Sequence, residues 1–171
     1  MTTAVSGTVS EVEVLRHQAR TTREVVRRNV DGLTQEESLI LPAPGGNCLN
    51  WVVGHLLRTY EQILPLLGQE RVLEEGALKQ YARGSSTLRD AAEALDLREL
   101  LTAWNEANDR FDAGLAGLTS EALDRPASIS PTGNPNETVR SLLATVVFHQ
   151  AYHAGQTGIL RRIAGKAGAI A

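Results

Sequence analysis

Four long segments of this chain carry apolar residues at three- and four-residue spacing. This spacing places the apolar side chains on one face of an α-helix, and each segment is too long for a strand. β-branched residues never alternate with polar residues over a long run, so the sequence predicts no sheet. The fold class predicted from this pattern is all-α, a four-helix bundle. We expect its helices over about residues 9–33, 50–67, 95–118 and 137–164.

Three turn-rich stretches separate the expected helices: residues 41–47, 68–86 and 124–136. Glycine, proline and serine are frequent in them, and these residues favour turns. The chain shows no internal repeat, and its 171 residues suit one domain with a single core. We therefore expect one helical domain over residues 1–171, with its first few residues mobile.

The first and second expected helices differ in how much of their surface is apolar. The first has one apolar stripe, with His17 on the opposite, solvated side. The stripe consists of Val12, Leu15, Ala19, Thr22, Val26, Val30 and Leu33. The second is apolar around most of its circumference, so we expect it to be buried on more than one side. Its polar strip consists of Asn50, Gly54, Arg58 and Glu61.

The fourth expected helix has polar residues at both ends that suit a helix. Asn136 precedes it and is a plausible cap for its free backbone N–H groups. Arg161 and Arg162 lie near its other end, where the helix dipole favours positive charge.

Charge and composition exclude several classes of protein. The formal net charge is -3, with 17 basic and 20 acidic residues, and the basic ones do not cluster. Nucleic-acid binding requires a basic face, so we expect no nucleic-acid partner. Residues 1–10 lack a secretory signal, and no stretch reaches the roughly 20 apolar residues that span a bilayer. The single cysteine, Cys48, cannot form an internal disulfide. We expect a cytoplasmic protein without a membrane partner.

Two histidines of the fourth helix suggest a metal site. His149 and His153 are four residues apart and therefore lie on one helix face, which they share with Val146, Gln156 and Leu160. Both imidazoles should point inward, where each nitrogen needs a partner and two adjacent positive charges are costly. One metal ion satisfies both rings. Two separately hydrogen-bonded core histidines are the alternative.

His55 lies one turn into the second helix at the edge of its apolar arc, where by itself it would be read as a lone core or boundary histidine. It is the candidate third ligand, because His149 and His153 provide only two and a stable site commonly has at least three from the protein. Three neutral nitrogens leave positions for water or substrate, as in catalytic sites. Imidazole ligands suit zinc, nickel, copper or iron. His17 points away from the core and is excluded.

Other known sites fit less well. Gln150 stands where the H-E-x-x-H helix of zinc proteases has its glutamate base, and an amide cannot act as that base. No Glu-x-x-His pair of a di-iron bundle occurs in the sequence. Cys48 near a helix start could have a lowered pKa, but a small unreactive residue is the favoured interpretation.

Two motifs give a resemblance to a known family. Residues 50–55 read Asn-Trp-Val-Val-Gly-His, which is similar to the W-x-x-G-H segment of DinB/YfiT-like proteins. Residues 149–162 read HQAYHAGQTGILRR, which is similar to the family signature H-x-x-x-H-x-G-Q-x-x-x-L-R-R. Helix order and loop placement extend the resemblance over nearly the whole chain.

The resemblance implies a bundle of up-down-down-up topology that is often dimeric. It also implies a divalent metal ion, zinc or nickel, on His55, His149 and His153. Some members transfer low-molecular-weight thiols to electrophiles or use them as cofactors, so such a thiol and an electrophile are the implied small-molecule partners.

Three functions remain open at this point. The first is a metal-dependent enzyme, either a thiol transferase or a hydrolase, in which Gln156 could orient a ligand or substrate. Hydrolysis is less favoured, because no Asp or Glu lies on the inner stripe of the fourth helix. The second is a non-catalytic metal-binding protein of the stress response. The third is a structural or interaction bundle whose histidines cluster by chance.

A face of small residues predicts a homodimer. It lies on the fourth helix opposite the histidines and consists of Ala144, Ala151, Gly155 and Gly158. Small side chains let another helix approach closely, and a two-fold contact would close the dimer. The alternative is that helix one or helix three of the same chain packs there.

Overall fold

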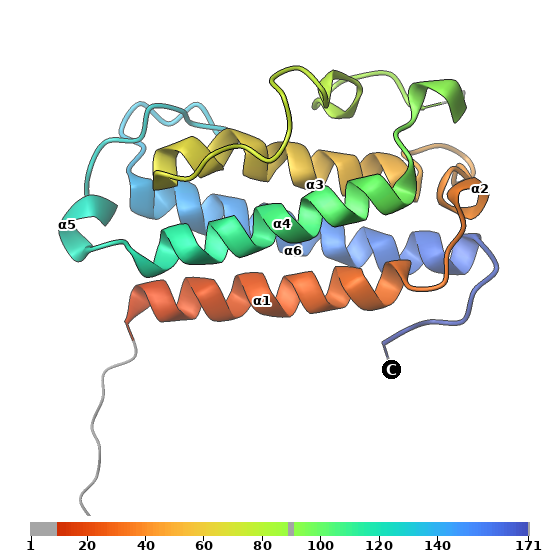
Figure 1. Ribbon diagram of the computed structural model, residues 1–171, viewed down its shortest axis with the longest axis horizontal. Coiled ribbons are helices and arrows are strands. Elements are labelled where there is room, and N and C mark those ends of the chain that lie inside the picture. The colour runs from red at the N-terminus through yellow and green to blue at the C-terminus, as the bar shows by residue number, and fades with distance from the viewer. Residues whose placement is uncertain (1–9, 89–90, 171) are drawn as a thin grey trace, which may run out of the picture.

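The computed structural model describes residues 10–88 and 91–170, which form a bundle of four long α-helices (Figure 1). These are α1 (Glu11–Val30), α3 (Leu49–Ile63), α4 (Leu97–Ala116) and α6 (Val139–Ile163). The connections contain α2 (Gln35–Ser38), α5 (Ser120–Leu123) and the 3-10 helices Leu64–Leu67, Lys79–Tyr81 and Ala91–Glu93. The described residues contain no strand and only one isolated bridge, between Pro126 and Thr138. The predicted all-α bundle is confirmed, whereas the expected mobility of the first few residues concerns positions outside the described ranges.

The four long helices pack as two neighbouring pairs. α1 lies along α6, and α3 lies along α4, with further contacts between α1 and α4 and between α3 and α6. The colours of Figure 1 show that α1 and α6 run in one direction and α3 and α4 in the other. Since α3 and α4 follow each other in the same direction, their connection has to return along the length of the bundle. This return places residues 68–88 and 91–96 on the outer side of α3 (Figure 1).

The helix boundaries follow local capping chemistry. The side chains of Ser10 and Asp96 accept hydrogen bonds from backbone N–H groups at the starts of α1 and α4. The predicted cap Asn136 is wrong: α6 begins after Thr138, which forms a reciprocal capping box with Ser141. The second predicted helix is also shorter than expected, because the chain tightens into a 3-10 helix around Pro65, which lacks a backbone N–H.

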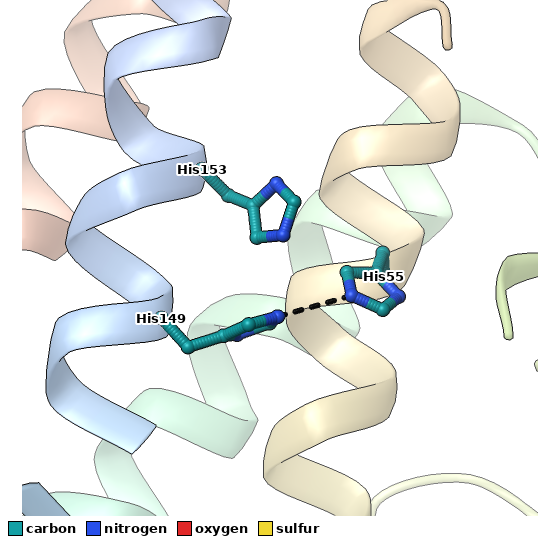
Figure 2. Close-up of side chains that lie close together, drawn as sticks. All are labelled: His55, His149 and His153. Carbon is teal, nitrogen blue, oxygen red and sulfur yellow. Dashed lines mark hydrogen bonds between the residues drawn. The ribbon is translucent and has the colours of Figure 1, made fainter. Parts of the chain in front are cut away.

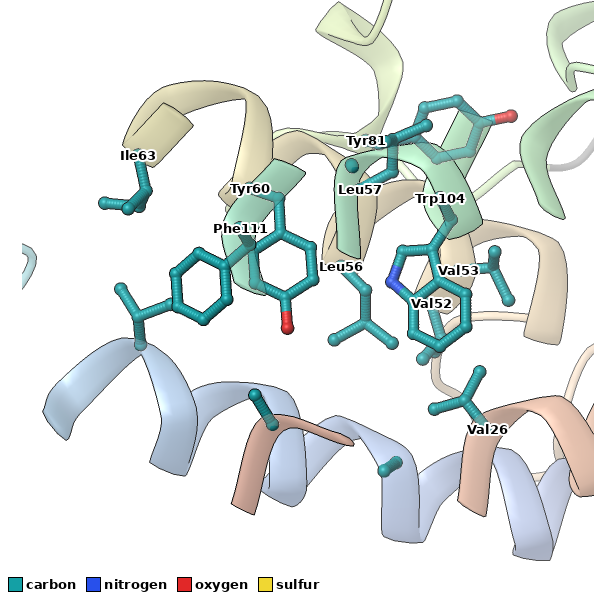
Figure 3. Packing of buried hydrophobic residues seen from close by; sticks show 14 of the residues in the cluster. Val26, Val52, Val53, Leu56, Leu57, Tyr60, Ile63, Tyr81, Trp104 and Phe111 are labelled. Atoms are coloured by element: carbon teal, nitrogen blue, oxygen red, sulfur yellow. The ribbon is translucent and has the colours of Figure 1, made fainter. Parts of the chain in front are cut away.

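The core lies between all four helices and is closely packed (Figure 3). The rings of Tyr60 from α3 and Phe111 from α4 have centroids 4.6 Å apart. Trp104 of α4 and Val26 of α1 are buried in the same core, so α1 and α4 share it with α3. The predicted stripe of α1 faces it: its five central positions, Leu15, Ala19, Thr22, Val26 and Val30, are buried.

The polar strip predicted on α3 is mostly buried beneath the returning connection. Tyr81 donates a hydrogen bond from its hydroxyl to Asn50 Oδ1 (2.9 Å) and accepts one from the backbone N–H of Leu95 (2.8 Å). The carboxylate of Glu61 accepts a hydrogen bond from the backbone N–H of Val72 (3.0 Å). The strip therefore anchors Val72, Tyr81 and Leu95 of the connection, and α3 is buried on more than one side, as expected.

The described helices include none that is both long and apolar enough to cross a membrane.

Candidate metal centre

Three histidines from two helices converge on one point (Figure 2). His55 comes from α3, and His149 and His153 come from successive turns of α6. One ligand nitrogen from each ring lies within 4.8 Å of the other two, and the Nε2 atoms of His55 and His149 are 3.1 Å apart. The structure thus brings together all three residues that the sequence singled out.

The histidines of α6 lie at the edge of the core rather than at its centre. The buried positions of this helix include Val147, Gln150 and Ala154 as well as Val146 of the predicted stripe, while His149 and His153 are half-buried. Their expected orientation into the apolar interior therefore needs correction. They face a cleft beside α3, which leaves the site open to small molecules.

Hydrogen bonds on the outer nitrogens fix the tautomers of two rings. His55 donates from Nδ1 to the carbonyl oxygen of Tyr81, at 2.8 Å, because that carbonyl can only accept. His153 Nδ1 lies 2.7 Å from Gln156 Oε1, which likewise acts as the acceptor. Both rings therefore carry their lone pair on Nε2, in the manner that outer hydrogen bonds orient metal-bound histidines. The Nδ1 of His149 is buried without a hydrogen-bond partner in the described part of the chain.

Burial keeps the imidazoles neutral. Desolvation is the largest cause that lowers the pKa of His55, His149 and His153, and it brings the pKa of His149 to about 4. The neighbouring His153 and His55 further lower the pKa of His149. Neutral rings at pH 7 do not have to lose a proton before they bind a cation.

Trp51 holds the ring of His55 from the side. The two rings are stacked, with centroids 4.7 Å apart and planes 13° from parallel. The indole Nε1 donates to the carbonyl oxygen of Gln80 and to Ser85 Oγ, at 3.1 Å each. His55 is therefore restrained by its own helix and by the returning connection together.

The geometry of this cluster fits a divalent metal ion. Nitrogens bound to a tetrahedral ion at about 2.1 Å each stand about 3.4 Å from one another. The observed spacing, 3.1 Å for one pair and at most 4.8 Å for all three, needs only small ring movements to reach this value. An all-imidazole donor set suits zinc, nickel, copper or iron.

A cleft of about 790 Å³ opens above the cluster. One wall consists of Trp51 and Val52 from α3, and the facing wall includes Tyr152, Gln156 and Ile159 from α6. Pro42 and residues 45–47 and 83–85 complete its rim. The lining contains no Asp or Glu among the described residues, so no carboxylate is available there as a general base.

The remaining candidates from the sequence lie outside the cluster. His17 is exposed on α1, as expected. Cys48 is fully buried at the start of α3, and burial raises the pKa of its thiol, in agreement with an unreactive residue. Gln150 is also buried and donates to the carbonyl oxygen of Leu56 at 3.0 Å.

Sequence reasoning missed two residues of the site, Tyr81 and Arg83. Both lie in the connection between α3 and α4, where no apolar period marks which residues fold back onto α3. Gly54 was the available signal, because a glycine inside a helix often has a packing reason. A Cβ atom at Gly54 would lie 2.3 Å from the ring of Tyr81.

The sequence matches the DinB superfamily over residues 18–157. The fold is similar to that in the crystal structure of a conserved protein from Enterococcus faecalis, with a TM-score of 0.70 and 16% sequence identity. The alignment covers 93% of this chain and 100% of that one. At this identity the likeness concerns the fold alone. No curated protein gives a match.

Proposed function

The chain belongs to the DinB superfamily, and from this premise we propose that it binds one divalent metal ion through His55, His149 and His153. One observation carries the proposal: three imidazole nitrogens from two helices lie within 4.8 Å of one another. Three protein ligands leave coordination positions for a small molecule, as in catalytic metal sites. The cleft above the cluster gives such a molecule access.

The proposed reaction is the transfer of a low-molecular-weight thiol to an electrophile. A bound divalent ion supplies the positive charge that holds a thiol as its thiolate at neutral pH. The thiol loses its proton to solvent, its sulfur forms a bond to the electrophilic carbon, and the leaving group departs with the electron pair. This chemistry requires no carboxylate base, which agrees with the absence of Asp and Glu from the described residues that line the cleft. Hydrolysis is less favoured, because no described carboxylate lines the cleft to act as a general base for the attacking water.

The residues around the histidines have positioning roles in this proposal. Tyr81 and Gln156 accept the Nδ1 protons of His55 and His153, so that both Nε2 lone pairs face the same point. Gln156 also lines the cleft, where its amide can contact a bound substrate. Trp51 restrains the plane of His55 and contributes an apolar surface beside it.

The second candidate is a metal-binding protein without turnover. The observation in its favour is that no Asp, Glu or Lys of the described residues lines the cleft, so proton transfer has few available groups there. Sequestration or sensing of the ion would need only the three histidines.

Metal analysis of protein purified without a polyhistidine tag or chelator tests the proposal. We expect about one zinc, nickel or similar ion per chain, and a content near zero contradicts metal binding. A screen of small thiols against 1-chloro-2,4-dinitrobenzene, followed by absorbance, then tests transfer. Turnover should depend on the ion and be lost in His153→Ala but retained in His17→Ala. Stoichiometric metal without turnover for any thiol supports the non-catalytic candidate instead.

A further inference from the structure

Among the described residues, the lining of the cleft above the histidines includes a positive charge and no negative charge. Arg83 is the one described lining residue with a permanent charge. It belongs to the connection that also supplies Tyr81 and Ser85 to the surroundings of His55. With a divalent ion on the three neutral histidines, Arg83 and the ion would face the same space. A ligand with negative charge is the natural complement to such a site.

Arg83 is exposed and forms no ion pair with a described residue. Other arginines of the bundle do have such partners: Arg16 and Arg20 bind Asp112, and Arg110 binds Glu106. The charge of Arg83 is close enough to lower the pKa of His55 and of His149, although burial is the larger cause. Its guanidinium group is thus both near the cluster and available for an external partner.

The same cleft has an apolar wall that is open to solvent. Tyr152, Ile159 and Ile163 are 58%, 60% and 40% exposed, and all three line the cleft from α6. Exposed apolar side chains that line a concave surface are typical of ligand-binding sites. The ligand that this wall suits has an apolar body.

We propose that the cleft binds a small organic anion, with a carboxylate or similar group facing Arg83 and an apolar body against Tyr152, Ile159 and Ile163. The inference rests on the proposed function for the ion at the base of the cleft and deepens it by naming the class of substrate. A guanidinium group recognises a carboxylate through two parallel charge-assisted hydrogen bonds. A neutral ligand of the same shape would leave these donors to water.

A pair of matched probes tests this specificity: 3-phenylpropionate, which carries the carboxylate, and 3-phenylpropanamide, which has the same body without the charge. Each is titrated into ¹⁵N-labelled protein, zinc-loaded and metal-free, and the affinity is measured from amide shifts of cleft residues. We expect wild type to bind the carboxylate about tenfold more tightly than the amide in the metal-free form. In the zinc-loaded form the preference should be larger, because the ion adds charge at the same place.

In the metal-free protein, Arg83→Gln should reduce the ratio of the affinities for the carboxylate and the amide to about one, while the spectrum stays that of a folded protein. Arg58→Gln is the matched control. Arg58 also lowers the pKa of His55 but lines a separate groove with Glu61 and Glu74, so this variant should keep the preference. The control separates direct contact with the ligand from the general effect of a nearby charge.

Three results would overturn the inference: equal affinity of wild type for both probes, an unchanged preference in Arg83→Gln, or shifts confined to residues outside the cleft. Failure of the proposed function would be visible separately, as an absence of stoichiometric zinc. The metal-free titration decides the role of Arg83 in either case.

Discussion

The Nδ1 atom of His55 lies 2.8 Å from the carbonyl oxygen of Tyr81, although 26 positions separate the two residues in the chain. Tyr81 is held in place from two sides. Its hydroxyl bonds to Asn50 and to the backbone of Leu95, and its ring lies directly against Gly54. The residue before His55 thus determines how closely Tyr81 approaches, and Tyr81 determines which nitrogen of His55 faces the site.

Gly54→Ala should therefore weaken both the fold and the site. The added Cβ would lie 2.3–2.5 Å from ring atoms of Tyr81, and the buried ring cannot move aside freely. We expect the free energy of unfolding to decrease by about 1–3 kcal/mol, the usual cost of overpacking. Metal affinity should also fall, because the carbonyl that orients His55 moves with the ring. Urea unfolding and metal titration measure the two effects.

Gly155→Ala is the matched control on α6. A Cβ atom there meets no other atom within 4 Å, and alanine favours a helix over glycine by up to about 1 kcal/mol. This variant should be as stable as wild type or slightly more so, with unchanged metal binding. Equal stability losses in both glycine variants would contradict the role assigned to Tyr81.

The second prediction concerns the ligands themselves. His149→Ala and His153→Ala should each abolish stoichiometric metal, because two remaining imidazoles hold a divalent ion poorly. His17→Ala should leave the metal content unchanged, since His17 is exposed on α1. Crystals of the zinc- or nickel-loaded protein should show metal–nitrogen distances of about 2.0–2.2 Å. Equal metal loss in all three variants would mean that the ion binds elsewhere.

The metal-free protein should become less stable as the pH falls from about 6.5. An unfolded histidine has a pKa near 6.5, whereas burial lowers the pKa of folded His149 to about 4 and also lowers those of His55 and His153. Between these pKa values the unfolded state binds more protons than the folded state. The free energy of unfolding therefore increases as the pH rises and decreases on acidification. We expect His149 alone to account for about 1–2 kcal/mol between pH 7.5 and 5.

Comparison with His149→Asn isolates this contribution, because asparagine does not titrate. Urea unfolding of both proteins at pH 7.5, 6 and 5 should show a smaller pH dependence in the variant. Parallel curves would contradict a lowered pKa at this position. Above pH 7 the free energies of unfolding of wild type and His149→Asn should change with pH to the same extent, since His149 is then neutral in both the folded and the unfolded state.

The helical framework could be predicted from the sequence because its signal is repetitive. Leu15, Ala19, Thr22, Val26 and Val30 are all buried, and each adds to the same period, so one irregular position does not disturb the pattern. Helix ends depend on single polar contacts instead. Asn136 and Thr138 are both plausible caps, and only Thr138 has a serine three residues later to complete the capping box.

The site could be predicted in part, because two of its histidines lie on one helix. The four-residue spacing of His149 and His153 places them together on any helix, whereas the approach of His55 depends on how α3 packs against α6. Tyr81 contributes its backbone carbonyl to the site, and every residue type has that group. No sequence pattern could therefore single out Tyr81. Metal binding and thiol transfer at this site stay predictions.

The homodimer also stays a prediction, and the structure narrows the surface that could form it. Gly158 packs within the chain, because a Cβ atom there would lie 3.3 Å from Asn29 of α1. For this residue the intrachain alternative is correct. Ala144, Ala151 and Gly155 are exposed, and Phe148 on the same helix is 69% exposed. A second copy that packs on this face would cover an apolar surface that a single chain leaves in water.

Ala151→Glu should convert the predicted dimer into a folded monomer that still binds metal. Ala151 is exposed in the single chain, so a charge there should change the free energy of unfolding by no more than about 0.5 kcal/mol. In a two-fold contact the two glutamates would face each other across a desolvated surface, and their repulsion opposes association. Ala113→Glu, at an exposed alanine of α4, is the matched control and should remain dimeric. Light scattering at low micromolar concentration measures the mass, and a monomeric wild type would rule out this dimer.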